Sequence, residues 1–144
     1  MGISRYATAH WEGDLKSGQG HLSTPESGLM DGTAYGFASR FGDRKGVNPE
    51  ELIAAAHAGC FTMATAFQLS GAGYTPETLT TDAELTMEKE EAGWTIKTIH
   101  LSLRGRVPGI TAEEFETIAG KAKAGCPVSR ALNAEITLSA ALES

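Results

Sequence analysis

The pattern of hydrophobic and polar positions begins with short alternating segments. Residues 4–11 alternate roughly between the two kinds of side chain, and several glycines separate them from a short apolar and polar segment at residues 21–23. Alternation is typical of strands and clustered glycines are typical of turns. The pattern therefore predicts a hairpin, followed by a third strand at residues 34–40, where aromatic and small side chains alternate.

A long helix is predicted from Pro49 to about Ser70. Asn48 suits the N-cap, Pro49 fits the first helical position, and Glu51 stands where a capping box places its carboxylate. Glycines after Ser70 end the helix, whose surface is apolar on nearly every side. Such a helix must be covered on every side, which is difficult for one chain of 144 residues, so the pattern predicts a partner subunit.

In the second half of the chain, the pattern of hydrophobic and polar positions predicts two strands, two helices and a final strand. Two alternating segments, residues 79–88 and 94–104, are separated by a turn, and apolar positions at helical spacing follow in residues 112–124. A short helix begins at Pro127, and alternation returns in residues 136–142. The order βββ, α, ββ, αα, β predicts an α+β fold.

Composition and charge narrow the class of protein. A chain of 144 residues with 41% hydrophobic residues fits one soluble domain over residues 1–144. Twelve basic residues against eighteen acidic ones, with no basic cluster, argue against a nucleic-acid partner. The N-terminus lacks the apolar core of a signal peptide, so we expect a cytoplasmic protein. The most apolar segment, residues 52–69, contains four polar residues, so we expect no membrane span. They are His57, Thr62, Thr65 and Gln68.

The two cysteines, Cys60 and Cys126, are the main candidates for chemistry. They are too few for a disulfide-rich scaffold, and neither has zinc-ligand spacing with the four histidines. The chain also lacks a glycine-rich phosphate loop, so we expect no metal and no cofactor.

The two thiols have different local environments. Cys60 lies in the middle of the long helix, where a lowered pKa requires a nearby cation, and Arg40 is one candidate. Cys126 precedes Pro127 at the start of a short helix, where backbone N–H groups favour a thiolate. Local physics alone makes Cys126 the more acidic thiol, although either cysteine can serve as a packing residue.

Two other functions remain open at this point. His57 lies three residues before Cys60, and a Cys-His pair is a known hydrolase arrangement, although no oxyanion-hole turn accompanies it. The alternative without turnover is a dimeric binding module for an apolar ligand, in which both thiols only pack.

Two segments resemble the OsmC/Ohr family of thiol-dependent peroxidases. Residues 48–61, Asn-Pro-Glu-Glu-Leu-Ile-Ala-Ala-Ala-His-Ala-Gly-Cys-Phe, are similar to the central helix of that family, and residues 121–129 are similar to its second-cysteine segment. Residues 10–13 and 35–41 resemble the OsmC branch in particular. The similarity covers essentially the whole chain.

The resemblance implies an intertwined α+β homodimer that reduces organic hydroperoxides without metal, haem or flavin, in defence against oxidative and osmotic stress. It implies that Cys60 is the peroxidatic cysteine and Cys126 the resolving cysteine, which form a disulfide that an external dithiol, of the lipoyl type, reduces. It also implies catalytic roles for Arg40 and Glu50. Apolar residues near Cys60 would favour alkyl or lipid hydroperoxides; the candidates are Phe61, Met63 and Phe67.

Helix geometry adds a prediction about these roles. A guanidinium beside Cys60 would lower the thiol pKa and bind the peroxide oxygens, and Glu50 would orient Arg40 through two hydrogen bonds. Ten residues of helix separate Glu50 from Cys60, a rise of about 15 Å. We therefore predict that antiparallel pairing of two central helices brings Arg40 and Glu50 of one chain to Cys60 of the other.

Overall fold

The computed structural model describes residues 2–143, so the ends of the predicted domain, residues 1 and 144, lie outside the described residues. The described chain forms two compact units, one ending at Leu52 and the other beginning at Ile53. Two three-stranded sheets and four helices confirm the predicted α+β class within residues 2–143. The single domain over residues 1–144 stays a prediction.

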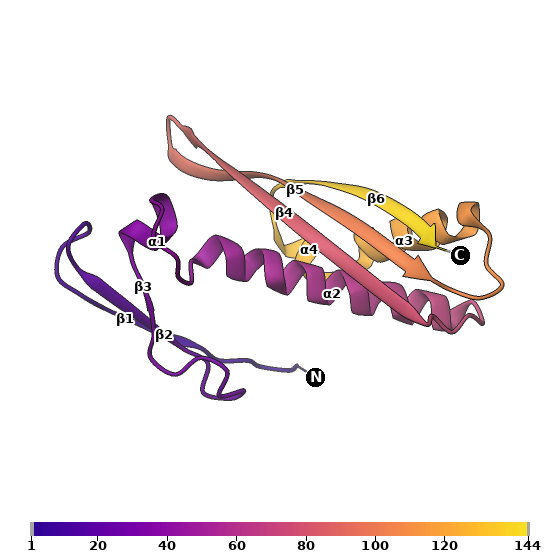
Figure 1. The fold of residues 1–144 in the computed structure, drawn as a ribbon, viewed down its shortest axis with the longest axis horizontal. Coiled ribbons are helices and arrows are strands. Elements are labelled where there is room, and N and C mark those ends of the chain that lie inside the picture. The colour runs from indigo at the N-terminus through magenta and orange to yellow at the C-terminus, as the bar shows by residue number, and fades with distance from the viewer. Residues whose placement is uncertain (1, 144) are drawn as a thin grey trace. The chain divides into compact units, whose positions relative to one another are not determined.

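The first unit contains an antiparallel sheet in the order β1-β2-β3 (Figure 1). Its strands are Thr8–Glu12, Gln19–Ser23 and Thr33–Tyr35, which confirms the predicted hairpin. Gly20 in β2 is buried between two aromatic rings, and a Cβ there would lie 2.5 Å from the ring of Tyr35 and 2.7 Å from that of Trp11. Only glycine lets these rings close over the strand.

The predicted third strand is wrong beyond Tyr35. The chain instead forms helix α1, Phe37–Phe41, which carries Arg40. The Ser39 hydroxyl accepts a hydrogen bond from the Gly36 N–H at 3.0 Å and donates one to the Val47 carbonyl at 3.0 Å. These side chain to backbone bonds favour a helical turn over an extended segment, and the alternating pattern could not show them.

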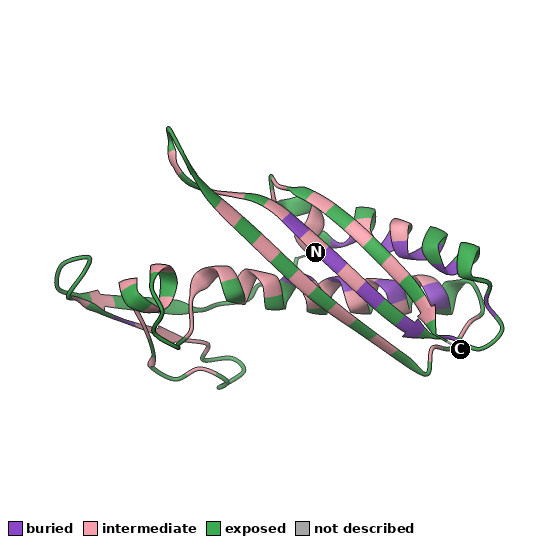
Figure 2. Cartoon of the chain, turned by 45° about the horizontal axis from the view of Figure 1, so that its top comes forward, coloured by how far each residue is buried: buried purple, intermediate pink, exposed green. Residues whose placement is uncertain are grey.

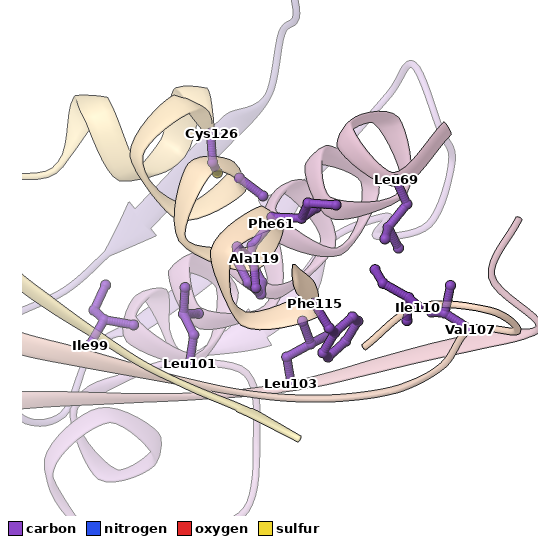
Figure 3. Close-up of a cluster of buried hydrophobic side chains, with 12 residues drawn as sticks. Phe61, Leu69, Ile99, Leu101, Leu103, Val107, Ile110, Phe115, Ala119 and Cys126 are labelled. Carbon is purple, nitrogen blue, oxygen red and sulfur yellow. The ribbon is translucent and has the colours of Figure 1, made fainter. Parts of the chain in front are cut away.

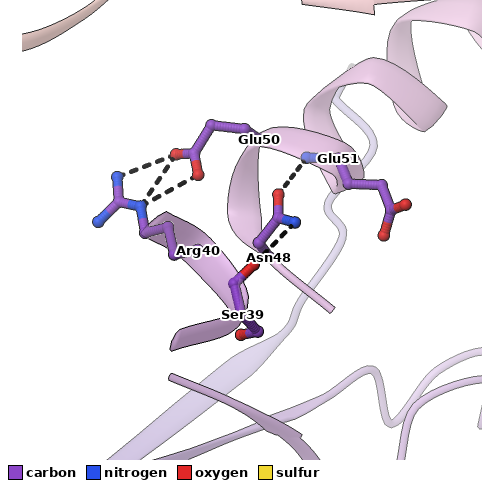
Figure 4. A network of polar contacts seen from close by, with 5 residues as sticks. All are labelled: Ser39, Arg40, Asn48, Glu50 and Glu51. Carbon is purple, nitrogen blue, oxygen red and sulfur yellow. Dashed lines mark hydrogen bonds and ion pairs between the residues drawn. The ribbon is translucent and has the colours of Figure 1, made fainter. Parts of the chain in front are cut away.

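Helix α2, Pro49–Gly71, confirms the predicted long helix. The Asn48 side chain accepts the Glu51 N–H at 2.8 Å, as an N-cap does (Figure 4). Residues spaced four apart form its buried face; they are His57, Phe61, Thr65 and Leu69. Met63 and Phe67 are each 75% exposed, so part of the apolar surface is uncovered in a single chain.

Length and composition also make α2 a weak candidate for a membrane span. It is the one helix among the described residues that is long and apolar enough to cross a bilayer, but core helices of soluble proteins meet the same two criteria. The absence of a membrane span therefore stays a prediction.

The second unit contains the sheet β4-β5-β6, formed by Thr78–Glu90, Gly93–Arg106 and Glu135–Glu143. Strand β4 is antiparallel to β5, whereas β6 is parallel to β5. A parallel neighbour requires a long crossover. Helices α3, Ala112–Gly125, and α4, Pro127–Ala131, supply it.

The core of the second unit lies between the helices and one face of this sheet. Figure 2 shows buried positions alternating along β5 and repeating along one side of α3. Figure 3 shows the side chains that meet there; they include Phe61, Leu69, Leu101, Leu103, Phe115, Ala119 and Cys126. This packing fixes α2 against α3, and the segment after α3 returns Cys126 to α2.

Candidate active site

The two thiols predicted as a couple meet in the second unit. The Sγ atoms of Cys60 and Cys126 lie 2.8 Å apart, and both cysteines are free. A disulfide bond is about 2.05 Å long, so the two sulfurs need to move less than about 1 Å closer when an oxidant removes two electrons and the two thiol protons leave. Cys126 is completely buried, whereas Cys60 is half-buried and is the thiol that solvent can reach.

The position of Cys126 is set by the end of α3 and the start of α4. Helix α3 ends at Gly125 and α4 begins at Pro127, so Cys126 caps both helices. Its N–H donates to the carbonyl of Ala122 at 2.9 Å, which fixes the backbone at the turn. The expectation from Pro127 that Cys126 stands at a helix start is confirmed.

The surroundings of the two sulfurs shift their pKa values in opposite directions. Burial raises the pKa of the Cys60 thiol, and contact with Cys126 adds to this. Burial opposes ionisation of Cys126 as well, but interactions with Cys60, Ser129 and the Val128 amide outweigh it and lower the pKa of Cys126. This difference agrees with the expectation from local physics that Cys126 is the more acidic thiol.

Arg40 and Glu50 form a bidentate ion pair in the first unit (Figure 4). Arg40 Nε lies 3.0 Å from Glu50 Oε1, and Arg40 Nη2 lies 2.9 Å from Glu50 Oε2. The Glu50 carboxylate is more buried, with 13% of its side chain exposed against 39% for Arg40. Hydrogen bonding to Glu50 raises the pKa of the Arg40 guanidinium.

The structure thus brings the four predicted site residues together in two pairs. Cys60 meets Cys126 in the second unit, and Glu50 orients Arg40 in the first. The predicted bidentate pairing of Arg40 is present. The joining of both pairs across a dimer stays a prediction.

A hydrogen bond between His57 and Ser129 was not predicted. His57 Nε2 lies 2.7 Å from Ser129 Oγ, and His57 is completely buried. The bond joins residues 72 positions apart, and the one sequence signal was the place of Ser129 in the turn after Cys126. In the described chain His57 pairs with Ser129 and Cys60 with Cys126, so the Cys-His pair of the hydrolase alternative is not formed.

The burial of His57 predicts a pH dependence of stability. Burial lowers its pKa below the ordinary value of 6.5, so the unfolded chain binds more protons than the folded one as the pH falls below 6.5. The free energy of unfolding should therefore decrease on acidification, with a contribution of at most about 1.4 kcal/mol per pH unit from this residue.

Urea unfolding of wild type and His57→Asn between pH 5 and 7.5 measures this contribution. The variant should lose part of the slope. Equal slopes in wild type and His57→Asn would contradict the prediction, whatever the difference in absolute stability.

The described structure brings the two thiols into contact with each other. Within residues 2–143, no group of three or more His, Cys, Asp or Glu side chains is placed to hold a metal ion. Fold and site together define an α+β protein with a pair of thiols in contact, one buried and one accessible.

Comparison with known proteins identifies the family. The model of the OsmC-like protein family matches residues 42–140. Over 144 residues, all of both chains, the sequence is 51% identical to Peroxiredoxin OsmC of Escherichia coli (strain K12). It is 34% identical over 99 residues to the organic hydroperoxide resistance protein OhrA of Bacillus subtilis (strain 168), which covers 67% of this chain and 69% of that protein. The chain belongs to the OsmC-like family, which confirms the resemblance.

A solved structure shows the same fold. An organic hydroperoxide resistance protein from Elizabethkingia anophelis matches with a TM-score of 0.75 and 24% identity, over 99% of this chain and all of that one.

Proposed function

We propose that this protein is a thiol-dependent peroxidase that reduces organic hydroperoxides to alcohols, in defence against oxidative and osmotic stress. The observation that carries the proposal is the contact between the Cys60 and Cys126 sulfurs, 2.8 Å apart with one thiol accessible. The relatives named Peroxiredoxin OsmC and organic hydroperoxide resistance protein OhrA support it.

The first chemical step is attack by the Cys60 thiolate on a hydroperoxide. The sulfur bonds to the distal oxygen, the O–O bond breaks, and the alkoxide leaves and takes up a proton to become the alcohol. Cys60 becomes a sulfenic acid. The sulfur is oxidised by two electrons and the peroxide is reduced by the same two.

The second step joins the two cysteines. Cys126 attacks the sulfenic sulfur of Cys60, the disulfide forms, and the hydroxyl leaves as water with the proton of the Cys126 thiol. An external dithiol, of the lipoyl type, then reduces the disulfide by thiol–disulfide exchange and becomes a disulfide itself. No metal or other cofactor enters these steps.

The difference in accessibility supports the proposed division of roles between the two cysteines. The first thiol must meet a substrate from solution, and Cys60 is the half-buried one of the pair. The second thiol needs to reach only Cys60, and Cys126 is completely buried against it. The lower pKa of Cys126 does not reverse this assignment, because a buried thiolate cannot meet the substrate first.

The raised pKa of Cys60 means that a cation must be supplied before this thiol ionises readily near neutral pH. Arg40, already oriented by Glu50, is the cation that we assign to this role. A guanidinium also donates the hydrogen bonds that a peroxide accepts. We infer that Arg40 and Glu50 of one subunit serve Cys60 of the other.

The uncovered surface of α2 supports a homodimer. Met63 and Phe67 lie one turn apart on α2 and are each 75% exposed, and adjoining exposed apolar side chains are typical of an interaction surface. A shallow, open surface that includes Met63 lies between α2 and β4; it is formed by Ala58, Gly59, Thr62, Met63, Ala66 and Thr81. A second copy would cover this surface and give the site the apolar wall that suits alkyl or lipid hydroperoxides. Of the predicted wall residues, Phe61 instead belongs to the core.

The proposal makes a direct prediction about mass. Reduced wild-type protein treated with cumene hydroperoxide should lose two hydrogens per chain and release one equivalent of cumyl alcohol. A dithiol such as dihydrolipoamide should restore the original mass and allow repeated turnover. Mass spectrometry and chromatography of the alcohol measure both results, and an unchanged mass would favour the apolar-ligand binding module instead.

The proposed thiol chemistry also indicates the cellular compartment in which the protein acts. Free cysteines that cycle through a disulfide require a supply of reductant, which reducing compartments provide. We infer that the protein acts in the cytoplasm, with no nucleic acid or membrane as partner.

A further inference from the structure

A cavity in the first unit is lined by three basic side chains. It has a volume of about 400 Å³, and its walls come from the turn between β1 and β2, strand β3, helix α1 and the loop before α2. The three cations are Lys16 from the turn and Arg44 and Lys45 from the loop. The thiol pair lies in the second unit, and the steps proposed above use none of these residues.

The lining carries positive charge without an opposing carboxylate. The chain has eighteen acidic and only twelve basic residues, yet no Asp or Glu of the described chain lines this cavity. The ion pairs of the described residues do not include Lys16, Arg44 or Lys45. Asp14, close to Lys16 in the chain, instead accepts the Ser17 N–H at 2.7 Å and the Ser17 hydroxyl at 2.6 Å. Unpaired cations repel one another, so an anion placed between them lowers the electrostatic energy.

Close packing of the backbone holds the loop with two of these cations against α1. Ser39 of α1 donates a hydrogen bond to the Val47 carbonyl at 3.0 Å. At Gly46, directly after Lys45, a Cβ would lie 3.2 Å from the Cβ of Ser39, which is a tight contact. The absence of a side chain at Gly46 therefore lets the loop approach α1 and brings Arg44 and Lys45 to the cavity.

Aromatic side chains form another part of the lining. Tyr35 and Phe37 both border the cavity. The Nζ atom of Lys16 lies 5.9 Å from the centroid of the Phe37 ring, within the range of a cation–π contact, which favours a position of this ammonium group at the cavity. A volume of about 400 Å³ is within the range of small-molecule sites. Cations beside aromatic rings suit a ligand that has both a negative group and an apolar part.

We propose that this cavity binds a small organic anion, a carboxylate or phosphate group attached to an apolar body. The negative group lies among Lys16, Arg44 and Lys45, and the apolar body lies against Tyr35 and Phe37. The inference concerns binding in the first unit and does not depend on the proposed peroxidase function.

Titration of the full chain, followed by nuclear magnetic resonance, tests the proposal. The probes are benzoate and phenyl phosphate, and acetate and inorganic phosphate are the comparisons without a ring, all at one ionic strength set with sodium chloride. The amide signals of Gly18, Gly36 and Gly46, which line the cavity, should shift and saturate. Each probe with a ring should bind severalfold more tightly than its comparison, because the ring contacts the aromatic wall. The tighter of the two probes identifies the preferred anionic group.

Variants of the cations separate this site from general charge effects. Arg44→Gln/Lys45→Gln should weaken binding about tenfold, because two charges that face the anion are lost. Both residues are exposed, so the fold does not depend on their burial. The matched control is Lys89→Gln/Lys97→Gln, which removes the same charge from strands β4 and β5 of the second unit and should leave the affinity unchanged.

A variant of the aromatic wall tests the other half of the site. Phe37→Leu keeps an apolar side chain but removes the ring. It should reduce the preference for the probes with a ring and leave the binding of inorganic phosphate nearly unchanged. Equal preference in wild type and Phe37→Leu would show that the ring plays no part and would contradict the proposed orientation of the ligand.

Three further results would overturn the site. The first is the absence of saturable shifts at the cavity with either benzoate or phenyl phosphate. The second is a set of equally large, unsaturated shifts at Lys89 and Lys97, which would indicate only weak attraction to surface charge. The third is an equal loss of affinity in the two double variants.

Discussion

Replacing Cys60 by serine should abolish peroxidase activity, with a loss of at least about a thousandfold in the rate of hydroperoxide consumption. A serine hydroxyl is not ionised near neutral pH and its oxygen is a poor nucleophile toward an O–O bond. The Cys126 thiol should not compensate, because it is buried and a substrate in solution cannot reach it. The measurement is peroxide consumption with a dithiol reductant, together with the mass of the treated protein, which should not change.

The matched variant is Cys126→Ser, which keeps the accessible thiol and removes its partner. It should take up oxygen at the wild-type rate, form no intramolecular disulfide, and become over-oxidised to the sulfinic acid under excess peroxide. The opposite pattern, with Cys60→Ser over-oxidised and Cys126→Ser unreactive, would exchange the two roles. Equal reactivity of both variants would contradict distinct roles altogether.

The second large effect concerns Arg40. Arg40→Ala should lower the rate of the first step by about a hundredfold, the usual cost of removing one such donor from a reacting oxygen. If Arg40 is the cation that serves Cys60, as proposed, the variant also leaves the raised pKa of the Cys60 thiol unopposed. If the site is shared between subunits, a heterodimer of one Arg40→Ala chain and one Cys60→Ser chain contains one complete site, and should show about half the wild-type rate.

A second heterodimer provides the control for this test. Wild-type chain paired with a chain carrying both substitutions has no complete site if Arg40 acts across the dimer, but one complete site if it acts within its own chain. The predicted rates are therefore near zero for this pair and about half for the first pair. Differential tags on the two chains allow each heterodimer to be isolated, and the reverse result would place Arg40 and Cys60 of one chain in the same site.

Much of the local structure could be predicted because its causes are local. The N-cap Asn48 accepts the backbone N–H group three residues on, as its position predicted. Thr111 caps α3 in the same way. The segment from Ala34 to Arg40 shows the limit of such reasoning. Alternation favoured a strand, but two hydrogen bonds of Ser39, one to a residue eight positions away, form α1 instead.

The sequence by itself determined most of the secondary structure, the α+β class and the family, and it selected the two cysteines as the main candidates for chemistry. Spacing, capping residues and short motifs contain that information. Only the tertiary structure decided that Cys60 and Cys126 touch, that Cys126 is the buried one, and that His57 bonds to Ser129. These contacts join residues 66 and 72 positions apart. They depend on how α2 packs against the segment after α3, which no local pattern encodes.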